Sequence, residues 1–140
     1  MSAEIQPELL LFFDGHLSAL PLFQALEERL FALFPDAGRR VQKTQITYFS
    51  RYVFACVSFL RVKRKAEMPE AYIVLTLGLP YPLNSVRVPV KCEPYPGRWT
   101  NHVLIGSLRE LDDELFSWLR EAYAFSSRKR QGKGKRLDTE

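Results

Sequence analysis

The chain has 140 residues, 46% of them hydrophobic and 26% charged, with a formal net charge of +4. A chain of this length and composition can bury a full core as one globular domain, which excludes a wholly disordered protein and a scaffold that depends on disulfides or metal. The positive charge lies at one end: residues 126–140 hold six of the 20 basic and two of the 16 acidic residues, so residues 1–125 are neutral overall.

Hydropathy and cysteine usage indicate an intracellular protein. No apolar run approaches the ~20 residues that span a bilayer, and no basic segment precedes the short run Leu9–Phe13, so we expect neither membrane insertion nor a signal peptide. Cys56 and Cys92 stand apart within apolar segments, a pattern that favours small buried side chains over a disulfide framework or a metal site. The sequence therefore predicts a cytoplasmic location, with no cofactor and no metal.

The first part of the chain predicts one helix. Residues 1–18 are expected to form a short lead-in that ends in a turn. Apolar residues at helical spacing then predict a helix from about Ala19 to Phe34, which Ser18 can cap and in whose first turn Pro21 is tolerated. Pro35 ends this element.

Strand patterns fill the middle of the chain. They predict strands at Val41–Phe49, Tyr52–Val62, Ala71–Leu79, Val86–Glu93 and, after a loop over residues 94–101, His102–Ile105. The link between the first two is predicted to be a tight hairpin at residues 50–51. In the fourth strand, Val86, Val88, Val90 and Cys92 alternate with polar residues, so this apolar side is expected to lie under the helices.

The last helix begins with a capping box, Ser107 and Glu110, and carries an apolar stripe from Leu108 to Phe125. The order of elements predicts an α+β domain over residues 1–125: an antiparallel sheet of four to five strands with an N-terminal and a C-terminal helix packed on one face. Residues 126–140 are expected to form a basic, disordered C-terminal tail.

Three stretches of the sequence resemble a known family. They are Lys43–Phe49, Phe54–Arg61 and Pro94–Val103 with the helix that follows. Together they resemble an uncharacterised bacterial domain-of-unknown-function family, which is also seen as the C-terminal module of proteins labelled "predicted transport protein". The resemblance covers about residues 10–126. It implies the α+β fold and a bacterial cytoplasmic origin, and it brings no activity, cofactor or catalytic residue.

One candidate site lies around the loop that precedes the last strand. It comprises Lys91, Glu93, Arg98, Trp99 and His102. If the loop folds back over the strand end, two cations and an indole ring could hold a planar anion, and His102 could transfer a proton. The alternative is a structural loop in which Trp99 closes the core.

Two further groups are basic. Lys43, Arg61 and Arg87 lie on strand-like segments and could converge on an anion at the open sheet face; the alternative is a solvated face with cross-strand ion pairs. The tail could contact nucleic acid, although it has no aromatic side chain for base stacking, or it could simply aid solubility. Its basic residues are Arg128, Lys129, Arg130, Lys133, Lys135 and Arg136.

These features favour a non-catalytic binding module for an anionic ligand or a protein partner. The alternative is an enzyme or nucleic-acid-processing accessory domain that uses Lys91, Arg98 and His102. Asp112–Glu114 begin a helix side by side, so they are interpreted as a polar helix face and not as an acid–base pair. A pocket with perturbed pKa values would favour the enzyme, and a flat face would favour a protein partner.

Overall fold

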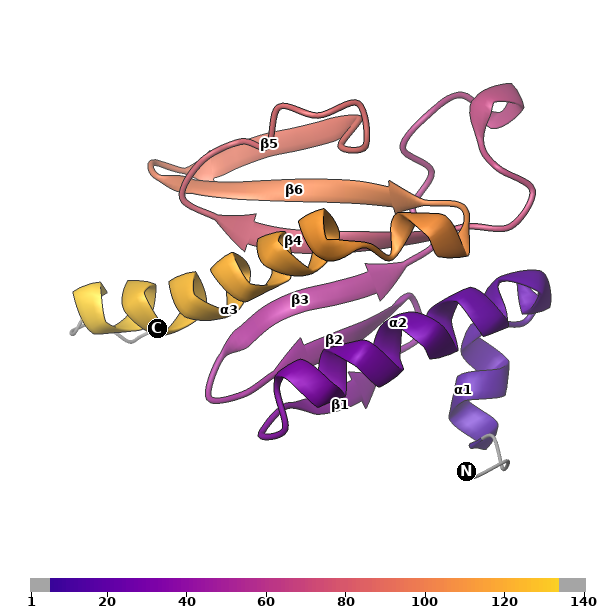
Figure 1. Cartoon of the computed structure of the whole chain (residues 1–140), viewed down its shortest axis with the longest axis horizontal. Helices are drawn as coiled ribbons and strands as arrows, with labels where there is room; N and C mark the ends of the chain where they lie inside the picture. The colour runs from indigo at the N-terminus through magenta and orange to yellow at the C-terminus, as the bar shows by residue number, and fades with distance from the viewer. Residues whose placement is uncertain (1–5, 134–140) are drawn as a thin grey trace.

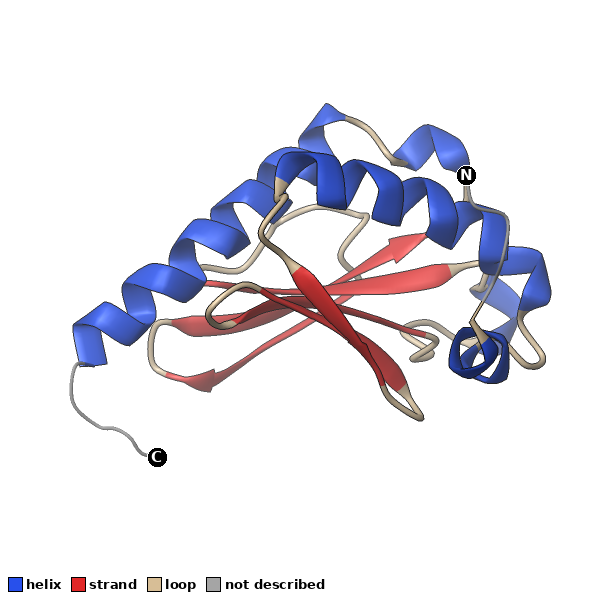
Figure 2. Cartoon of the chain, turned by 90° about the horizontal axis from the view of Figure 1, so that it is seen from below, coloured by secondary structure: helices blue, strands red, loops and turns tan. Residues whose placement is uncertain are grey.

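A computed structural model describes residues 6–133, with side chains as far as Arg128. Six antiparallel strands form one sheet, and α2 and α3 lie across one face of it (Figures 1 and 2). The strands are β1 (Gly38–Val41), β2 (Gln45–Phe49), β3 (Val53–Ser58), β4 (Ile73–Leu79), β5 (Val90–Tyr95) and β6 (Arg98–Ile105). The helices are α1 (Pro7–Phe12), α2 (Leu20–Leu33) and α3 (Asp113–Lys133), with short 3-10 turns η1 (Leu17–Ala19), η2 (Lys65–Glu67) and η3 (Leu108–Glu110).

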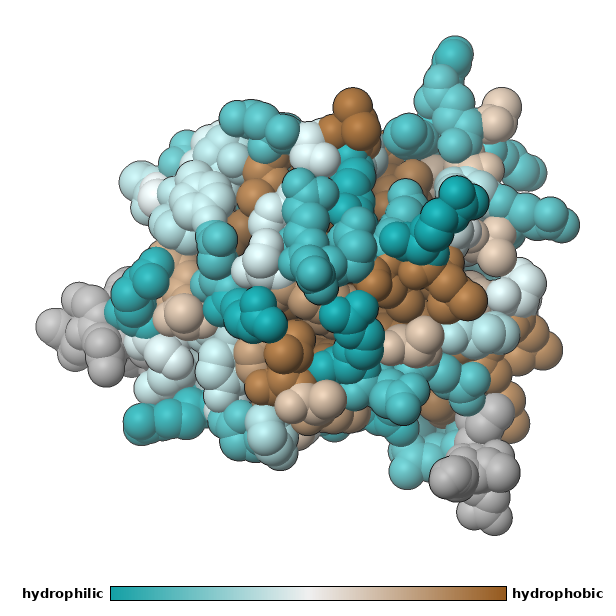
Figure 3. Space-filling view, viewed as in Figure 1, coloured by the Kyte–Doolittle hydropathy of each residue, from teal (hydrophilic) through white to brown (hydrophobic). Residues whose placement is uncertain are grey.

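The sheet order is β1-β2-β3-β4-β6-β5. The predicted α+β class and antiparallel sheet are confirmed, with six strands where four to five were expected. Alternation along β4 sends Leu75 and Leu77 to the side of the helices, where both are fully buried, as predicted. In the view from the helix side, hydrophilic side chains cover much of the surface and apolar ones show between them (Figure 3).

The predicted helix at Ala19–Phe34 is confirmed as α2, which buries Leu22, Phe23, Leu26 and Leu30 against the sheet. The final helix is also confirmed. Its predicted capping box is present, and the carboxylate of Glu110 accepts hydrogen bonds from the backbone N–H groups of Gly106 and Ser107. That capping box lies at the N-terminus of η3, however, and α3 starts later, at Asp113. The Asp112 carboxylate accepts a hydrogen bond from the Leu115 N–H and so caps α3.

The lead-in predicted for residues 1–18 contains a helix that the sequence analysis did not identify, because Pro7–Phe12 form α1. Pro7 suits the first position of a helix, where its missing N–H leaves no hydrogen bond unmade. Leu9, Phe12 and Phe13 then face the core. Gly15, with φ of +83°, turns the chain toward η1.

The predicted strand at Val41–Phe49 is wrong in extent: Val41 ends β1, residues 42–44 form a turn, and only Gln45–Phe49 form β2. The loop predicted at residues 94–101 is wrong in extent: β5 runs to Tyr95 and β6 starts at Arg98, so only residues 96–97 form the hairpin turn, in which Gly97 has φ of +75°. The predicted hairpin at residues 50–51 is present between β2 and β3.

The predicted strand Val86–Glu93 is wrong in extent and in facing. Strand β5 begins at Val90; Val86 precedes it and is 92% exposed. Val90 pairs with His102 and so lies on the sheet face opposite α2 and α3. Cys92 lies on that same face and is exposed, so the prediction that Cys92 is buried is wrong. Of the apolar set expected under the helices, Val88 alone belongs to the main core.

A second, smaller apolar cluster lies on the face opposite α2 and α3, called here the open face. Val62, from the loop after β3, packs on Val74 and Leu104, and Met68 and Tyr72 border them. Tyr72 donates a hydrogen bond to the Phe59 carbonyl, 2.9 Å. These contacts hold the β3–β4 loop, with η2, against one end of the open face.

Helix α3 runs on to Lys133, past the point at which the tail was predicted to begin. Residues 134–140 lie outside the described part of the chain, so the tail stays a prediction there. No helix within residues 6–133 has the length and apolar character needed to cross a bilayer.

Candidate functional site

A row of polar side chains crosses the middle of the open face. Thr47 pairs with Cys56, Cys56 with Thr76, and Thr76 with His102, so β2, β3, β4 and β6 each contribute one residue. Paired positions in neighbouring strands place their side chains on the same face, about 5 Å apart. The next row holds Gln45 and Ser58, which also pair with each other.

A hollow of about 680 Å³ opens over these two rows. Its floor is polar, and the segment from α1 to η1, the β1–β2 turn and the end of β3 form its walls. Its lining residues are Leu11, Phe12, Asp14, His16, Lys43, Thr44, Gln45, Cys56, Ser58, Phe59, Leu60, Thr76 and His102. The volume falls in the range of small-molecule sites.

His102 and Thr76 are joined at the floor, with 2.8 Å between the imidazole Nδ1 and the hydroxyl Oγ1. Burial lowers the pKa of His102, so the ring is neutral at pH 7. Among the described residues Nε2 has no hydrogen-bond partner. In one tautomer it offers an acceptor to the hollow, and in the other it offers a donor.

Cys56 lies on the other side of Thr76. Burial raises the pKa of the Cys56 thiol, and a hydrogen bond with the Thr76 hydroxyl offsets part of that rise. The thiol is therefore protonated at pH 7, whereas a nucleophilic cysteine needs a lowered pKa. The arrangement of Cys56, Thr76 and His102 is a neutral hydrogen-bonding surface, and it holds no thiolate.

The charged residues that line the hollow are Asp14 and Lys43. Further cations lie beside it. Arg61 and Lys63 are exposed and flank Val62 in the sequence. Val62 packs on Val74, which is two residues before the floor residue Thr76 in β4. Among the described residues, no ion pair engages Lys43, Arg61 or Lys63.

The structure does not bring together the five residues predicted around the β5–β6 loop. Lys91 pairs with buried Asn101 on the helix side of the sheet, where its ammonium donates to the Leu83 carbonyl, 2.7 Å. Trp99 pairs with Leu79 on that same side, whereas Arg98 and His102 lie on the open face.

Glu93 and Arg98 make local contacts at the hairpin end. The Glu93 carboxylate accepts a hydrogen bond from the Gly97 N–H, 3.0 Å, and the Arg98 guanidinium lies over the Tyr95 ring, 6.0 Å from its centroid. Of the predicted group, only His102 lines the hollow.

The predicted cationic face divides in the same way. Lys43 lines the hollow and Arg61 lies near it, but Arg87 is on the helix side. Its guanidinium donates to the carboxylates of Asp112 and Glu114 and to the Glu110 carbonyl, and it covers the Trp118 ring. Arg87 therefore attaches the loop before β5 to the start of α3, and it is not available to an anion.

Of the basic residues of the predicted tail, only Arg128 has a described side chain, and it does not line this hollow. Arg128 lies over the Phe125 ring, 5.7 Å from its centroid. Lys129, Arg130 and Lys133 belong to α3, with side chains beyond the described part, and Lys135 and Arg136 lie outside the described residues. Within the described residues, no three His, Cys, Asp or Glu side chains gather where they could hold a metal ion.

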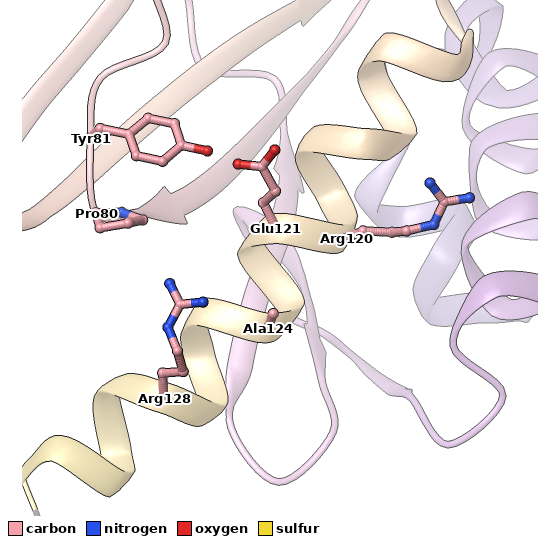
Figure 4. A pocket seen from close by; sticks show the side chains of 6 residues that line it. All are labelled: Pro80, Tyr81, Arg120, Glu121, Ala124 and Arg128. Atoms are coloured by element: carbon pink, nitrogen blue, oxygen red, sulfur yellow. The ribbon is translucent and has the colours of Figure 1, made fainter.

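A second hollow, of about 350 Å³, lies between the end of β4 and α3. Its charged residues point in different directions: Arg128 toward Pro80, Glu121 toward Tyr81, and Arg120 away from both (Figure 4). Because Glu121 stands between the two guanidinium groups and they do not converge, this hollow is a poorer anion site than the one on the open face.

The sequence analysis missed Gln45, Cys56, Ser58 and Thr76 as floor residues. Their signal was present in three short alternations, in which Gln45 and Thr47, Cys56 and Ser58, and Thr76 and Gly78 each flank one apolar residue. That pattern marks an uncovered sheet face. It does not tell which part of the face is hollow, since α1 and the loop after β3 form the walls.

Comparisons with known proteins place the chain in a family. Searches among curated proteins and solved structures give no match. A family model, described as Domain of unknown function (DUF5655), matches residues 11–126 and so includes every residue that lines the hollow. The chain belongs to this family of domains of unknown function.

Proposed function

We propose that the chain is a non-catalytic binding module that holds a small anionic organic molecule in the hollow on the open face. One observation carries the proposal: a concave site combines a neutral hydrogen-bonding floor, built from Thr76 and His102, with the unpaired cation Lys43. Hollows of this kind, with apolar walls and a few placed polar groups, are typical of ligand sites.

The two alternatives raised by the sequence fit the hollow less well. A protein partner that binds by surface contact would favour a flat or convex face. For an enzyme, the raised pKa of Cys56 leaves no thiolate nucleophile, and His102, although its neutral ring could act as a base toward Thr76, has no carboxylate partner among the described residues to orient it. We also propose a reducing, cytoplasmic location, which the free thiols of Cys56 and Cys92 support.

The test uses a panel of small carboxylates, phosphates and sulfonates, with binding followed by NMR shifts of the His102 ring. We expect at least one class of anion to shift these signals saturably. Ser58→Phe, which places a ring in the hollow, should abolish the effect. Thr100→Phe is the matched control, because Thr100 is a half-buried residue of the open face outside the hollow. Binding that survives Ser58→Phe, or no binding by any class, would contradict the proposal.

A further inference from the structure

The walls and the floor of the hollow differ in chemistry. Leu11, Phe12, Phe59 and Leu60 supply apolar surface on one side, whereas the floor presents side chains that form hydrogen bonds. A ligand complementary to both has apolar faces and a polar edge. Flat nitrogen heterocycles have this character, because their ring faces are apolar and their ring nitrogens and exocyclic groups form hydrogen bonds.

The floor can contact such an edge with both donors and acceptors. Nε2 of His102 serves as either one, depending on the tautomer. The Ser58 hydroxyl accepts a hydrogen bond from the Leu60 N–H, 3.3 Å, and keeps its own proton to donate. The Gln45 amide donates to the Thr47 hydroxyl, 2.9 Å, which leaves its carbonyl oxygen as an acceptor. Gln45 and Ser58 stand on adjacent strands, β2 and β3, whereas His102 stands on β6, two strand spacings or about 10 Å from β3. The floor therefore spans a base together with its sugar.

The cations lie at one end of this floor. Gln45 and Ser58 pair at one end of the antiparallel strands β2 and β3. Lys43 comes two residues before Gln45, and Leu60 comes two residues after Ser58. Both residues therefore lie beyond the same end of the sheet. Arg61 follows Leu60 directly. The exposed cation Lys43 therefore lines one end of the hollow, and exposed Arg61 is one residue beyond the lining residue Leu60, while His102 lies farther in.

One acidic group completes the lining. Asp14, from the segment between α1 and η1, is exposed at the wall. An ionised carboxylate accepts hydrogen bonds only, and sugar hydroxyls are among its natural donors in nucleotide sites. Asp14 would repel an anionic group placed beside it, so it favours a ligand that separates its anion from a neutral part bearing hydroxyls.

Resting on the proposed function, we infer that the ligand is a nucleotide, with its base on the floor near His102, its sugar beside Asp14 and its phosphate between Lys43 and Arg61. The same chemistry is present in a free mononucleotide and in a nucleotide of a single strand. The aromatic and basic residues around an open antiparallel sheet suit either source.

The experiment measures affinities of the full chain by calorimetry for AMP, GMP, CMP and UMP. Adenosine and ribose 5-phosphate are the half-ligands. At least one nucleotide should bind about tenfold or more tightly than either half-ligand, since each half lacks one set of hydrogen bonds. Lys43→Ala and Arg61→Ala should each weaken the nucleotide about tenfold and leave adenosine unchanged, while Ser58→Phe should abolish binding and Thr100→Phe should not.

Short single-stranded oligoribonucleotides distinguish the two sources. Oligonucleotides that bind more tightly than mononucleotides and lose binding in Ser58→Phe identify a single strand as the ligand; equal or weaker binding identifies the free nucleotide. The inference is overturned if oligonucleotides bind, mononucleotides do not, and the oligonucleotides bind Ser58→Phe as tightly as they bind the wild type. The contact then lies outside the hollow.

Two other results separate this inference from the proposed function. If carboxylates or sulfonates bind in the hollow and no nucleotide does, or if ribose 5-phosphate binds as tightly as every nucleotide, the nucleotide assignment is overturned and the anion-binding function stands. If no anion of any class binds, both fail.

Discussion

The hydroxyl of Tyr48 on β2 donates a hydrogen bond to the carboxylate of Glu27 on α2, over 2.8 Å. The same carboxylate forms an ion pair with Arg39 on β1, and the side chains of Glu27 and Arg39 are 15% and 20% exposed. Burial, and then the neighbouring Glu27, raise the pKa of Tyr48, so its phenol keeps its proton. This contact fixes α2 over the β1–β2 edge of the sheet.

Removing the hydroxyl tests that contact. Tyr48→Phe should lower the free energy of unfolding by about 1 kcal/mol, the usual worth of one hydrogen bond. Glu27→Ala should cost more, about 3 kcal/mol, because it leaves Arg39 without its partner in a largely buried position. Urea denaturation measures both. The control is Glu67→Ala, which removes the exposed pair with Arg64 and should change stability by about 0.5 kcal/mol or less.

The central strand gives a second prediction. Leu77 is fully buried between the sheet and the helices, so Leu77→Ala should lower the free energy of unfolding by about 2–5 kcal/mol through lost burial and the cavity left behind. Val86→Ala, at a residue that is 92% exposed, should have almost no effect. A loss below about 1 kcal/mol at Leu77 would mean that the strand does not face the core in this way.

Arg87 gives a third prediction, because several acceptors share its guanidinium. Arg87→Lys should destabilise the protein by about 1–3 kcal/mol, since one ammonium cannot serve Asp112, Glu114 and the Glu110 carbonyl together. Arg109→Lys, at an exposed position, is the control and should be neutral. Equal melting temperatures for the two variants would show that the contacts of Arg87 contribute nothing to stability.

The sequence predicted the elements whose pattern is long and regular. Helix α2, the strand with Leu75 and Leu77, and the capping box at Ser107 all followed from spacing, because period 3.6 and period 2 are visible within one segment. Helix α1 was missed because it has only six residues, although Pro7 followed by Leu9 and Phe12 carried the signal. The β1–β2 turn was missed because Gln42–Thr44 contain no glycine or proline.

The site was harder to predict because it depends on register. The alternation from Val86 to Cys92 indicated a strand but not where it starts, and Pro89, which has no N–H, lies just before β5. Val90 pairs with His102 on the open face, so Lys91 lies on the helix side and the predicted set separates. His102 was identified from its residue type, whereas Thr76 and Cys56 needed the neighbouring strands to be known.

The last prediction concerns pH. Burial lowers the pKa of His102 below its usual 6.5, so the folded state binds a proton there less readily than the unfolded chain. Above about pH 6.5 both states are neutral at this residue and it has no effect on stability. As the pH falls from 6.5 toward the folded-state pKa, the unfolded chain takes up a proton that the folded state does not, so stability decreases. His102→Gln removes this contribution and keeps a polar side chain beside Thr76.

The measurement is the free energy of unfolding of the wild type and of His102→Gln between pH 5 and 7.5. The carboxylates with lowered pKa values, Asp36 and Asp112, lose their contribution only below pH 4 or so, outside this range. We expect the wild type to lose stability relative to the variant as the pH falls below 6.5, with the NMR titration of the His102 ring shifted to lower pH. If the difference in the free energy of unfolding between the wild type and His102→Gln does not change with pH, His102 is not held in its neutral form by the floor of the hollow.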